Sequence, residues 1–436
     1  MHPRLKALAE KPWQVALLLG VAALILFSFH IGIPSKPMFD EVHYLPAAQA
    51  LIDQSAPRNA EHPLVGKELI ALGMLVFGDT PYGWRVMPSL AGAATVIAAF
   101  ALLWLLTRRM RPAVVGALLL MLNQLLFVLA RIAMLDVFLG AFLLWAMVAL
   151  TWSMKAGTRE QALRRWIAGS VLLGLAVGVK WAAIPYVALA GLAFLVIRLR
   201  DARLARRPLA TAITGKDQPH GPGLATIPAL LIMGAVSIAV YLLTFLPAFF
   251  YAERPLTLAT LIPFQQEMYA LQTQVLKSHP YQSSWWSWPL LLRPVWAFYE
   301  FYNGAWRGVL VLGNPLIMWG GLLGVGACIV AWFKSRAIVP LAMALLWTAS
   351  LAIYIVIPKS LGFYYYYHLS AIFLCLALAV AFDHFDRGRK RGREEWFLAA
   401  SLLVFAYFYP IIAAMPLADG GGFNRWMWEF GFNNWR

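Results

Sequence analysis

Two adjacent carboxylates, Asp40 and Glu41, follow the first long apolar stretch of the chain and have the character of a reaction site. A pair of acids at the mouth of a membrane-spanning helix does not help the helix insert, and ionisable residues in such positions are usually functional. The simpler interpretation is a solvated pair of loop acids without a chemical role. The functional interpretation gains weight because other ionisable residues occur at similar positions.

Two lysines indicate the kind of ligand that such a site would hold. Lys180 is embedded in apolar sequence, so its charge requires an anion or a water-filled cavity. Lys359 precedes a run of tyrosines that ends at His368, which places a cation beside aromatic side chains that can form hydrogen bonds. A phosphate near the bilayer surface would satisfy these cations. The combination favours group transfer from a lipid-linked phosphate donor.

The ionisable residues that could form the site share one predicted side of the membrane, near the ends of apolar segments. They are Asp40, Glu41, His62, Lys67, Arg131, Asp136, Lys180, His279, Arg293, Lys359 and His368. For any one of them, a structural ion pair or a side chain reaching to the interface is as good an explanation as a chemical role. Arg131 and Asp136 are five positions apart, which disfavours a pair along one helix face. Taken together, the set predicts an active site at one membrane face.

The elements that must position these residues are membrane-spanning helices. The 436-residue chain is 61% hydrophobic and 13% charged and has a mean hydropathy of +0.68, which is typical of a polytopic membrane protein. Its formal net charge of +16 lies in short basic clusters between apolar segments, which indicates topology and not nucleic-acid binding. The sequence has no phosphate-binding glycine loop, zinc-protease motif or serine-hydrolase motif. Its two cysteines, Cys328 and Cys375, lie in apolar segments and give no metal-ligand spacing.

Eleven apolar segments are long enough to span a bilayer, so we expect an all-α polytopic protein with about eleven transmembrane helices. They lie near residues 13–31, 86–106, 113–130, 133–153, 166–180, 181–197, 225–249, 308–333, 337–357, 364–382 and 396–415. The first is predicted to be a retained signal anchor, because no small-residue cleavage site follows it.

Charge distribution predicts the orientation. With the N-terminus inside, an odd number of spans places every basic cluster in the cytoplasm, as the positive-inside rule requires. These clusters lie at residues 4–11, 108–111, 155–165, 198–216, 334–336 and 387–393, and so include Arg206 and Arg389. The C-terminal tail, residues 416–436, is then expected on the extracytoplasmic side.

Two predicted extracytoplasmic segments, residues 32–85 and 250–307, are too long to be simple connectors, and long loops are often functional. The first has apolar residues at helical spacing in Leu45–Ile52 and Leu64–Phe77, which is typical of helices on a membrane surface. The second contains a tryptophan-rich stretch at residues 280–289. An interfacial aromatic belt would explain that stretch without any further function.

The chain resembles the protein O-mannosyltransferase family, within the GT-C superfamily of glycosyltransferases that use polyprenyl-phosphate sugars. The resemblance extends over most of the chain and rests on blocks in family order, which are Phe39–Tyr44, Glu61–Lys67, Gly83–Arg85, Arg131–Asp136, Gly178–Trp181, His279–Pro289 and Tyr366–His368. Residues 250–307 are too short to hold the large soluble domain of the eukaryotic members, so the chain resembles the bacterial type. In the second block, Leu64 and Val65 stand where the family usually has a second proline and a leucine.

The resemblance implies an inverting transfer of mannose from a polyprenyl-phosphate to a Ser or Thr hydroxyl of a translocated protein. Residues 1–436 would form one GT-C domain in the inner (plasma) membrane, with the active site on the extracytoplasmic side. The hydroxyl must lose its proton as it attacks, and we expect Asp40 to accept that proton, with Glu41 as the alternative.

The same resemblance, together with the predicted topology, assigns the remaining residues of the site. We expect the donor phosphate to be bound by Arg131, Lys180, Lys359, His368 and Arg293. We expect the substrates to be bound by His62, Lys67, Asp136, His279, Tyr281, Trp285 and Trp286. No residue is assigned to a metal, and a requirement for a divalent cation is left open.

Two other functions compete with this one. A related GT-C enzyme that moves another lipid-linked sugar to a glycolipid such as lipid A would have the same architecture. The block His279–Pro289 favours the protein mannosyltransferase branch, but residues alone do not identify the donor sugar. A transporter or flippase would place ionisable residues near the membrane midplane and would have paired broken helices. Here these residues lie at segment ends, which disfavours transport.

Overall fold

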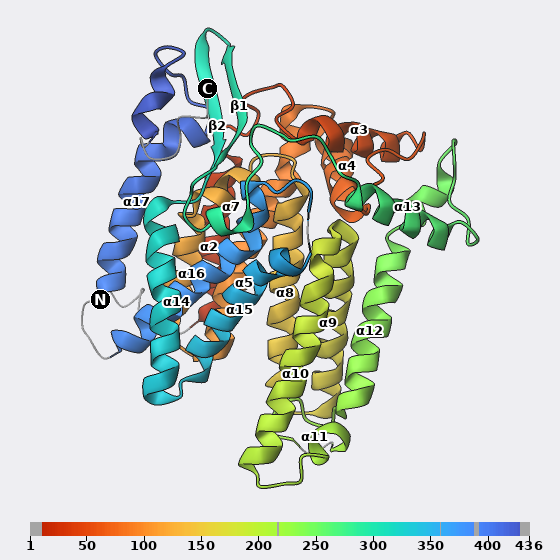
Figure 1. The fold of residues 1–436 in the computed structure, drawn as a ribbon, viewed down its shortest axis with the longest axis vertical. Coiled ribbons are helices and arrows are strands. Elements are labelled where there is room, and N and C mark those ends of the chain that lie inside the picture. Colours follow the sequence, from red (N-terminus) through yellow and green to blue (C-terminus); the bar gives the residue numbers. More distant parts are fainter. Residues whose placement is uncertain (1–10, 216–217, 358, 388–391, 428–436) are drawn as a thin grey trace.

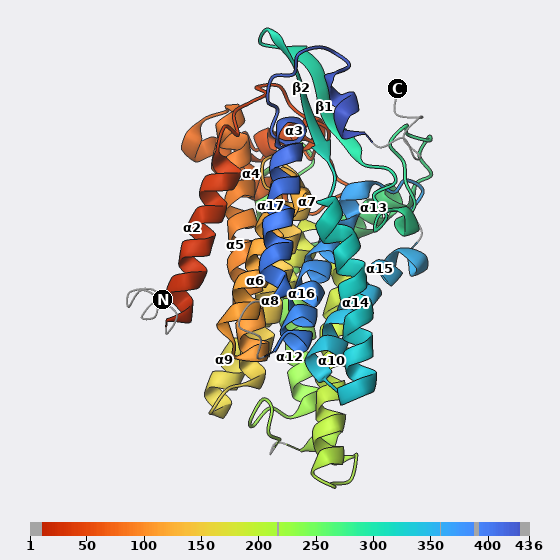
Figure 2. The ribbon, with the colours of Figure 1, turned by 90° about the vertical axis from the view of Figure 1, so that its left-hand side faces the viewer.

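The computed structural model describes residues 11–215, 218–357, 359–387 and 392–427. Long helices run roughly along the longest axis of the molecule, and short helices, loops and a β-hairpin gather at one end, which we call the hairpin end (Figure 1). The view turned by 90° shows the same arrangement, with α2 along one side of the bundle (Figure 2).

The helices of the bundle are α2 (Pro12–Ser28), α5 (Pro81–Thr107), α6 (Met110–Met121), α8 (Leu135–Met154), α9 (Arg159–Val179), α10 (Ile184–Leu204), α12 (Thr226–Leu243), α14 (Pro315–Ser335), α15 (Ile338–Val356), α16 (His368–Phe385) and α17 (Arg393–Ile412). Shorter helices are α3 (Glu41–Ile52), α4 (Val65–Phe77), α7 (Gln124–Leu129), α11 (Thr211–Thr214) and α13 (Leu261–Thr273). Single 3₁₀ segments are η1 (Trp181–Ala183), η2 (Leu246–Phe250), η3 (Trp285–Ser287), η4 (Tyr364–Tyr367) and η5 (Gly422–Trp426).

A helix occupies each of the eleven predicted apolar segments. Within the described ranges, nine helices are long and apolar enough to cross a membrane, while α2 and α6 are shorter apolar helices. The largely helical, polytopic fold is therefore confirmed, and the count of eleven spans stays a prediction. The predicted segment 113–130 is divided at Asn123, whose side chain accepts a hydrogen bond from the Leu125 backbone at the start of α7, and the segment 308–333 begins in a strand.

The helices α8 and α16 are the most deeply packed and position the site. Helix α16 packs against α6, α14 and α15, and α8 packs against α5 and α9. Asp136 lies in the first turn of α8, and His368 begins α16. Lys180 lies between α9 and η1 in an extended conformation (φ −151°, ψ 139°), so the chain breaks its helix at this charged residue.

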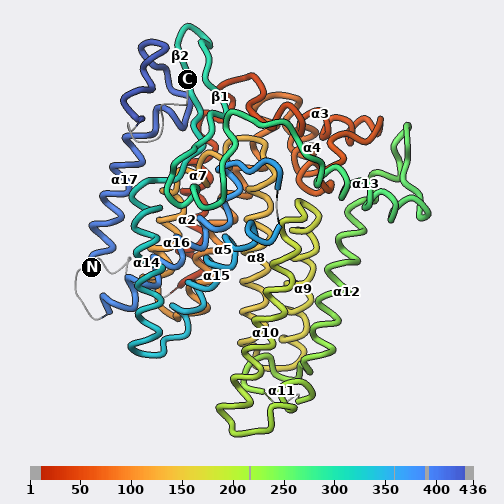
Figure 3. The backbone as a smooth tube through the Cα atoms, in the orientation of Figure 1, coloured from red at the N-terminus to blue at the C-terminus, as the bar shows by residue number. Residues whose placement is uncertain are grey.

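At the hairpin end, segments far apart in the sequence lie side by side (Figure 3). The helices α3 and α4 occupy the two stretches predicted as surface helices. Backbone hydrogen bonds join Ala252 to Gln54 and Glu253 to Ser55, so the two long loops contact each other directly.

The second long loop contains an antiparallel hairpin that the sequence analysis did not predict. Strands β1 (Val295–Tyr302) and β2 (Ala305–Val311) pair from Val295 opposite Val311 to Tyr302 opposite Ala305. The turn between them is Asn303-Gly304, and both residues have positive φ values (48° and 74°), as a tight hairpin turn requires.

Candidate active site

A cavity of about 360 Å³ lies among α8, the α9–α10 junction, α13, α15 and the start of α16. Several residues predicted to form the site line it together, although they come from distant parts of the chain. They are His62, Asp136, Lys180, Lys359 and His368. The remaining lining is mainly apolar and aromatic, which is typical of a small-molecule site.

Lys180 and Asp136 form a buried ion pair in this cavity, with 2.7 Å between Nζ and Oδ2. The sequence analysis expected an anion or water for Lys180, and Asp136 supplies part of that countercharge. The Lys180 ammonium also lies 5.6 Å from the ring centre of Tyr365 and 5.7 Å from that of Tyr366. These contacts fix the cation in place and leave it able to contact a further anion.

Asp40 is connected to the cavity through the tyrosines. The hydroxyl of Tyr365 donates to Asp40 Oδ2 at 3.1 Å, and the rings of Tyr365 and Tyr366 are 4.9 Å apart, with Tyr366 in the cavity wall. Burial raises the pKa of the Asp40 carboxyl above its usual value, the positive charge of Lys180 opposes that rise, and Asp136 adds to it. Asp40 therefore binds a proton more readily than an exposed aspartate.

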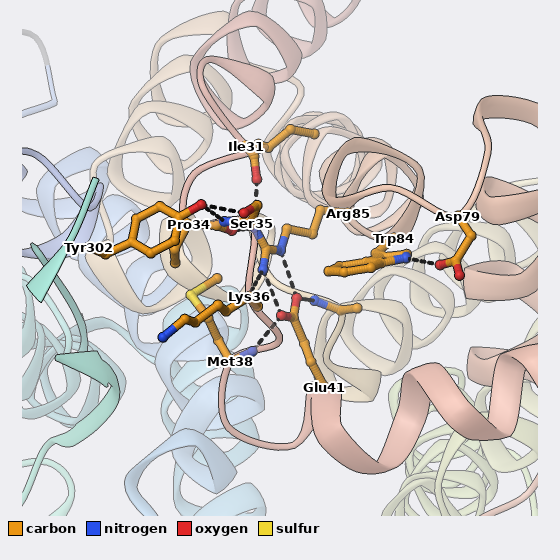
Figure 4. A network of polar contacts seen from close by, with 11 residues as sticks. Ile31, Pro34, Ser35, Lys36, Met38, Glu41, Asp79, Trp84, Arg85 and Tyr302 are labelled. Carbon is orange, nitrogen blue, oxygen red and sulfur yellow. Dashed lines mark hydrogen bonds and ion pairs between the residues drawn. The ribbon is translucent and has the colours of Figure 1, made fainter. Parts of the chain in front are cut away.

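Glu41, the next residue, has a different environment (Figure 4). Its carboxylate is fully buried and accepts hydrogen bonds from Nε and Nη2 of Arg85, both at 2.8 Å. It also accepts hydrogen bonds from the backbone N–H groups of Met38 and Ala133, each at 2.7 Å. These donors occupy both carboxylate oxygens, so Glu41 is placed to hold α3 against α5 and the turn before α8.

Arg85 was not predicted as a site residue, although it lies in a block that carries the family resemblance. It is completely buried in α5. Beyond Glu41, its guanidinium donates to the backbone carbonyls of Ile31, Pro34 and Lys36. An arginine inside an otherwise apolar helix is the sequence signal that could have identified it, because such a charge needs several partners.

Two predicted phosphate ligands lie elsewhere. Arg131 donates to the carbonyls of Phe27 at 2.9 Å and Phe29 at 2.6 Å, and thus ties the end of α2 to the turn before α8. Arg293 donates to the carbonyl of Gln282 at 3.2 Å. Neither arginine lines the cavity.

Lys67 supports the loop that carries His62. Its ammonium donates to the carbonyls of Asn59 at 2.8 Å and His62 at 2.7 Å, and burial lowers its pKa to about 7. Burial, followed by the charge of Lys180, holds the pKa of His62 well below its ordinary value, which favours the neutral form of its ring. His62 Nδ1 is buried and has no hydrogen-bond partner within the described parts of the chain.

The aromatic residues of the second loop divide into two groups. His279 packs against Phe39, the residue before Asp40, at 6.4 Å between ring centres, and Tyr281 packs against His279 at 5.6 Å. Trp285 and Trp286 form η3, and Trp286 is 56% exposed. Neither tryptophan lines the cavity.

Trp288, from the same stretch, was not assigned a role in the sequence analysis. It is buried and packs against Tyr354 and Tyr366 of the cavity wall, with ring centres 4.8 and 6.1 Å away.

With this geometry described, comparison with known proteins identifies the family. Residues 76–254 match the dolichyl-phosphate-mannose-protein mannosyltransferase family, and residues 257–435 match the C-terminal four TMM region of protein-O-mannosyltransferase. The chain belongs to the protein O-mannosyltransferase family. It is therefore a multi-pass membrane protein and a member of a glycosyltransferase family.

Individual protein O-mannosyltransferases agree with this assignment over nearly the whole chain. A polyprenol-phosphate-mannose–protein mannosyltransferase of Mycolicibacterium smegmatis is 25% identical, and the match covers 97% of this chain and 93% of that protein. A solved structure of the Saccharomyces cerevisiae protein O-mannosyltransferase Pmt1–Pmt2 complex, bound to the sugar donor, contains a chain that superposes on this protein with a TM-score of 0.77. The two chains are 14% identical, and the superposition covers 97% of this chain and 93% of the yeast chain. This likeness supports the expected GT-C fold.

A more distant relative covers a smaller part of the chain. An undecaprenyl phosphate-α-4-amino-4-deoxy-L-arabinose arabinosyl transferase of Pseudomonas aeruginosa is 33% identical, but the match covers only 39% of this chain and 31% of that protein. In sequence, the near-full-length match is thus to the protein mannosyltransferase and the partial match is to the arabinosyl transferase.

Proposed function

We propose that this protein is an inverting glycosyltransferase that moves mannose from polyprenyl-phosphate-mannose to Ser or Thr hydroxyls of translocated proteins. The observation that carries the proposal is the connection of Asp40 through Tyr365 and Tyr366 to a cavity containing Lys180 and Lys359. A base next to a cationic cavity is what the transfer of a sugar from a phosphate to a hydroxyl requires.

Asp40 is the proposed base. In an inverting reaction, the hydroxyl oxygen attacks the anomeric carbon on the side opposite the phosphate, the bond from that carbon to the phosphate oxygen breaks, and the hydroxyl proton goes to Asp40. The hydrogen bond from Tyr365 orients the carboxylate, and burial increases its affinity for the proton. Glu41 has its carboxylate occupied by four donors, so we assign it to positioning and not to proton transfer.

Lys180, Lys359 and His368 are the proposed partners of the donor phosphate. Both lysines line the cavity, and Lys359 has no ion pair within the described ranges. His368 stands at the N-terminus of α16, where the helix dipole favours an anion, and both of its ring nitrogens lack partners among the described residues. The phosphate gains charge as the sugar leaves, so these groups stabilise the transition state more than the bound donor.

We further propose that the whole chain forms one catalytic domain in the plasma membrane, with the hairpin end on the extracytoplasmic side. The two long loops and the C-terminal tail then face the compartment into which acceptor proteins are translocated. Among the described residues no group of three or more His, Cys, Asp or Glu is arranged to hold a metal ion. Addition of a chelator to the transfer assay tests a divalent-cation requirement directly.

The test is a transfer assay with the purified protein in lipid nanodiscs, polyprenyl-phosphate-mannose and a peptide containing serine and threonine. We expect mass spectrometry to detect one added hexose on a hydroxyl, and cleavage by an anomer-specific mannosidase to show that the anomeric configuration is opposite to that of the donor. A parallel assay offers lipid A as acceptor, because a partial relative transfers a different lipid-linked sugar. Transfer to lipid A but not to the peptide would contradict the proposal.

A further inference from the structure

Helix α13 forms one wall of the cavity, through Tyr269, Gln272 and Thr273. Tyr269 and Gln272 are three positions apart and therefore lie on the same face of the helix. Tyr269 is 62% exposed, so its ring stands at an open edge of the cavity.

The orientation of α13 is fixed by a chain of hydrogen bonds. The indole of Trp181, which lines the cavity, donates to the hydroxyl of Tyr241 at 2.8 Å, and that hydroxyl donates to Gln265 of α13. Gln265 and Gln272 are seven positions apart, which is close to two helical turns. The anchored face of α13 is therefore the face that presents Gln272 to the cavity.

Gln272 has unused hydrogen-bonding capacity in this position. Its amide Nε2 is buried and has no partner in the described parts of the chain. His62 Nδ1, in the wall of the same cavity, is also buried and unpartnered there. Buried polar groups without partners are rare in folded proteins, and in a cavity they indicate a ligand that supplies the missing partners.

The chemistry of these groups differs from that of the lysines. An amide and a neutral imidazole do not neutralise a phosphate, but they match sugar hydroxyls, each of which can donate and accept a hydrogen bond. An aromatic face such as that of Tyr269 carries a negative quadrupole and attracts the weakly positive C–H groups of a sugar ring. The cavity thus holds cationic groups suited to a phosphate together with neutral groups suited to a hexose.

We propose that Gln272 and Tyr269 of α13, with His62, recognise the sugar of the lipid-linked donor, a conclusion that rests on the proposed function. Gln272 donates to a hydroxyl of the hexose, and the ring of Tyr269 packs on its C–H face. Specificity for the sugar comes from α13, whereas Lys180 and Lys359 bind the phosphate that every such donor shares.

The experiment compares a donor that has the sugar with a lipid that lacks it. In the full-length protein in nanodiscs, the Michaelis constant for polyprenyl-phosphate-mannose is measured beside the inhibition constant of sugar-free polyprenyl phosphate. Gln272→Met keeps the length of the side chain and removes its hydrogen bonds. The matched control is Gln266→Met, the same change on the exposed side of α13. Tyr269→Leu tests the aromatic contact independently.

We expect Gln272→Met to raise the Michaelis constant for the mannosyl donor about two- to tenfold, the effect of one lost neutral hydrogen bond. The inhibition constant of polyprenyl phosphate should stay within about twofold, and Gln266→Met should change neither constant. The inference is overturned if Gln272→Met weakens the binding of both lipids equally, or if neither Gln272→Met nor Tyr269→Leu changes the binding of either lipid. In both cases the proposed function still stands as long as the wild-type protein transfers mannose. A wild-type protein that transfers no mannose overturns both.

Discussion

A carboxylate can act as a general base only if one of its oxygens is free to receive a proton. Glu41 has two guanidinium and two backbone N–H donors on its oxygens, and releasing any of them exposes a buried charge. Asp40 accepts a hydrogen bond from Tyr365 and lies 3.5 Å from the hydroxyl of Tyr44, at the limit of such a contact. The two neighbours therefore divide between them the tasks of proton transfer and structural support.

Replacing the proposed base tests this division. Asp40→Asn keeps the shape of the side chain and removes the proton acceptor, so we expect the transfer rate to fall about 10²- to 10⁴-fold. The rate is measured at saturating donor and acceptor, and binding of polyprenyl phosphate serves as the control for an intact cavity. Wild-type turnover in Asp40→Asn would exclude Asp40 as the base.

The raised pKa of Asp40 gives the reaction a specific pH dependence. Only the ionised carboxylate accepts a proton, so the rate falls as the pH decreases through the pKa of Asp40. Because burial raises that pKa, we expect the decline to begin above the ordinary aspartate value of about 3.9. The measurement is kcat/KM against pH, and the acidic decline should be absent from the residual activity of Asp40→Asn.

The cations of the cavity are expected to differ from Arg131 in their effects. Lys180→Gln and Lys359→Gln each remove a charged partner of the phosphate, which should lower kcat/KM about ten- to a hundredfold. Arg131→Gln removes hydrogen bonds to the carbonyls of Phe27 and Phe29, so it should lower stability and leave the donor Michaelis constant unchanged. Kinetics for the three variants, with thermal unfolding of each, separate the two effects. If only Arg131→Gln raised the donor Michaelis constant, the phosphate would be assigned to Arg131 and not to the two lysines.

At the scale of elements, the Arg85–Glu41 pair joins α5, α3, the chain before Asp40 and the turn before α8. Breaking one side of a buried ion pair leaves an uncompensated charge, so Arg85→Met should cost about 3–5 kcal/mol of stability. The double variant Arg85→Met with Glu41→Gln should lose less, because its remaining side chain is neutral.

The control for this prediction is Arg254→Met, which removes an exposed ion pair with Glu267 of α13. Its expected cost is at most about 1 kcal/mol. Stability is measured by unfolding in mixed detergent micelles. An Arg85→Met protein as stable as Arg254→Met would show that the buried pair does not hold the Asp40 segment in place.

The sequence predicts the helices well because a bilayer-spanning helix needs a continuous apolar run, which is visible locally. The hairpin was missed because residues 295–307 were assigned to a loop and residues 308–311 to the start of a membrane span, although Asn303-Gly304 between two aromatic runs is a strong hairpin signal. The structure brings five of the predicted site residues together around the cavity, namely His62, Asp136, Lys180, Lys359 and His368, and their roles stay a prediction. The contacts between them were not predicted. The partner of Lys180 is Asp136, 44 positions away, and no local spacing relates them.

At the scale of the whole molecule, the two ends of the bundle differ in the segments that they carry. The hairpin end holds α3, which directly follows Asp40, with α4, α13 and the hairpin, whereas the loop between α10 and α11, which contains Arg206 and Arg207, lies at the other end (Figure 1). Basic residues favour the cytoplasmic side of a membrane. This asymmetry is the basis for our proposal that the hairpin end, with the proposed active site, faces the extracytoplasmic side.

Labelling of single cysteines tests this orientation. Cys328 and Cys375 are both buried, so replacing them with alanine gives a background for Arg206→Cys and His279→Cys, two exposed positions at opposite ends of the bundle. In intact spheroplasts we expect a membrane-impermeant thiol reagent to label position 279 and to label position 206 only after the membrane is permeabilised. Both positions are exposed, so protection of one and not the other reports the side of the bilayer on which each lies. Labelling of position 206 in intact spheroplasts would reverse the orientation and move the proposed transfer to the cytoplasmic face.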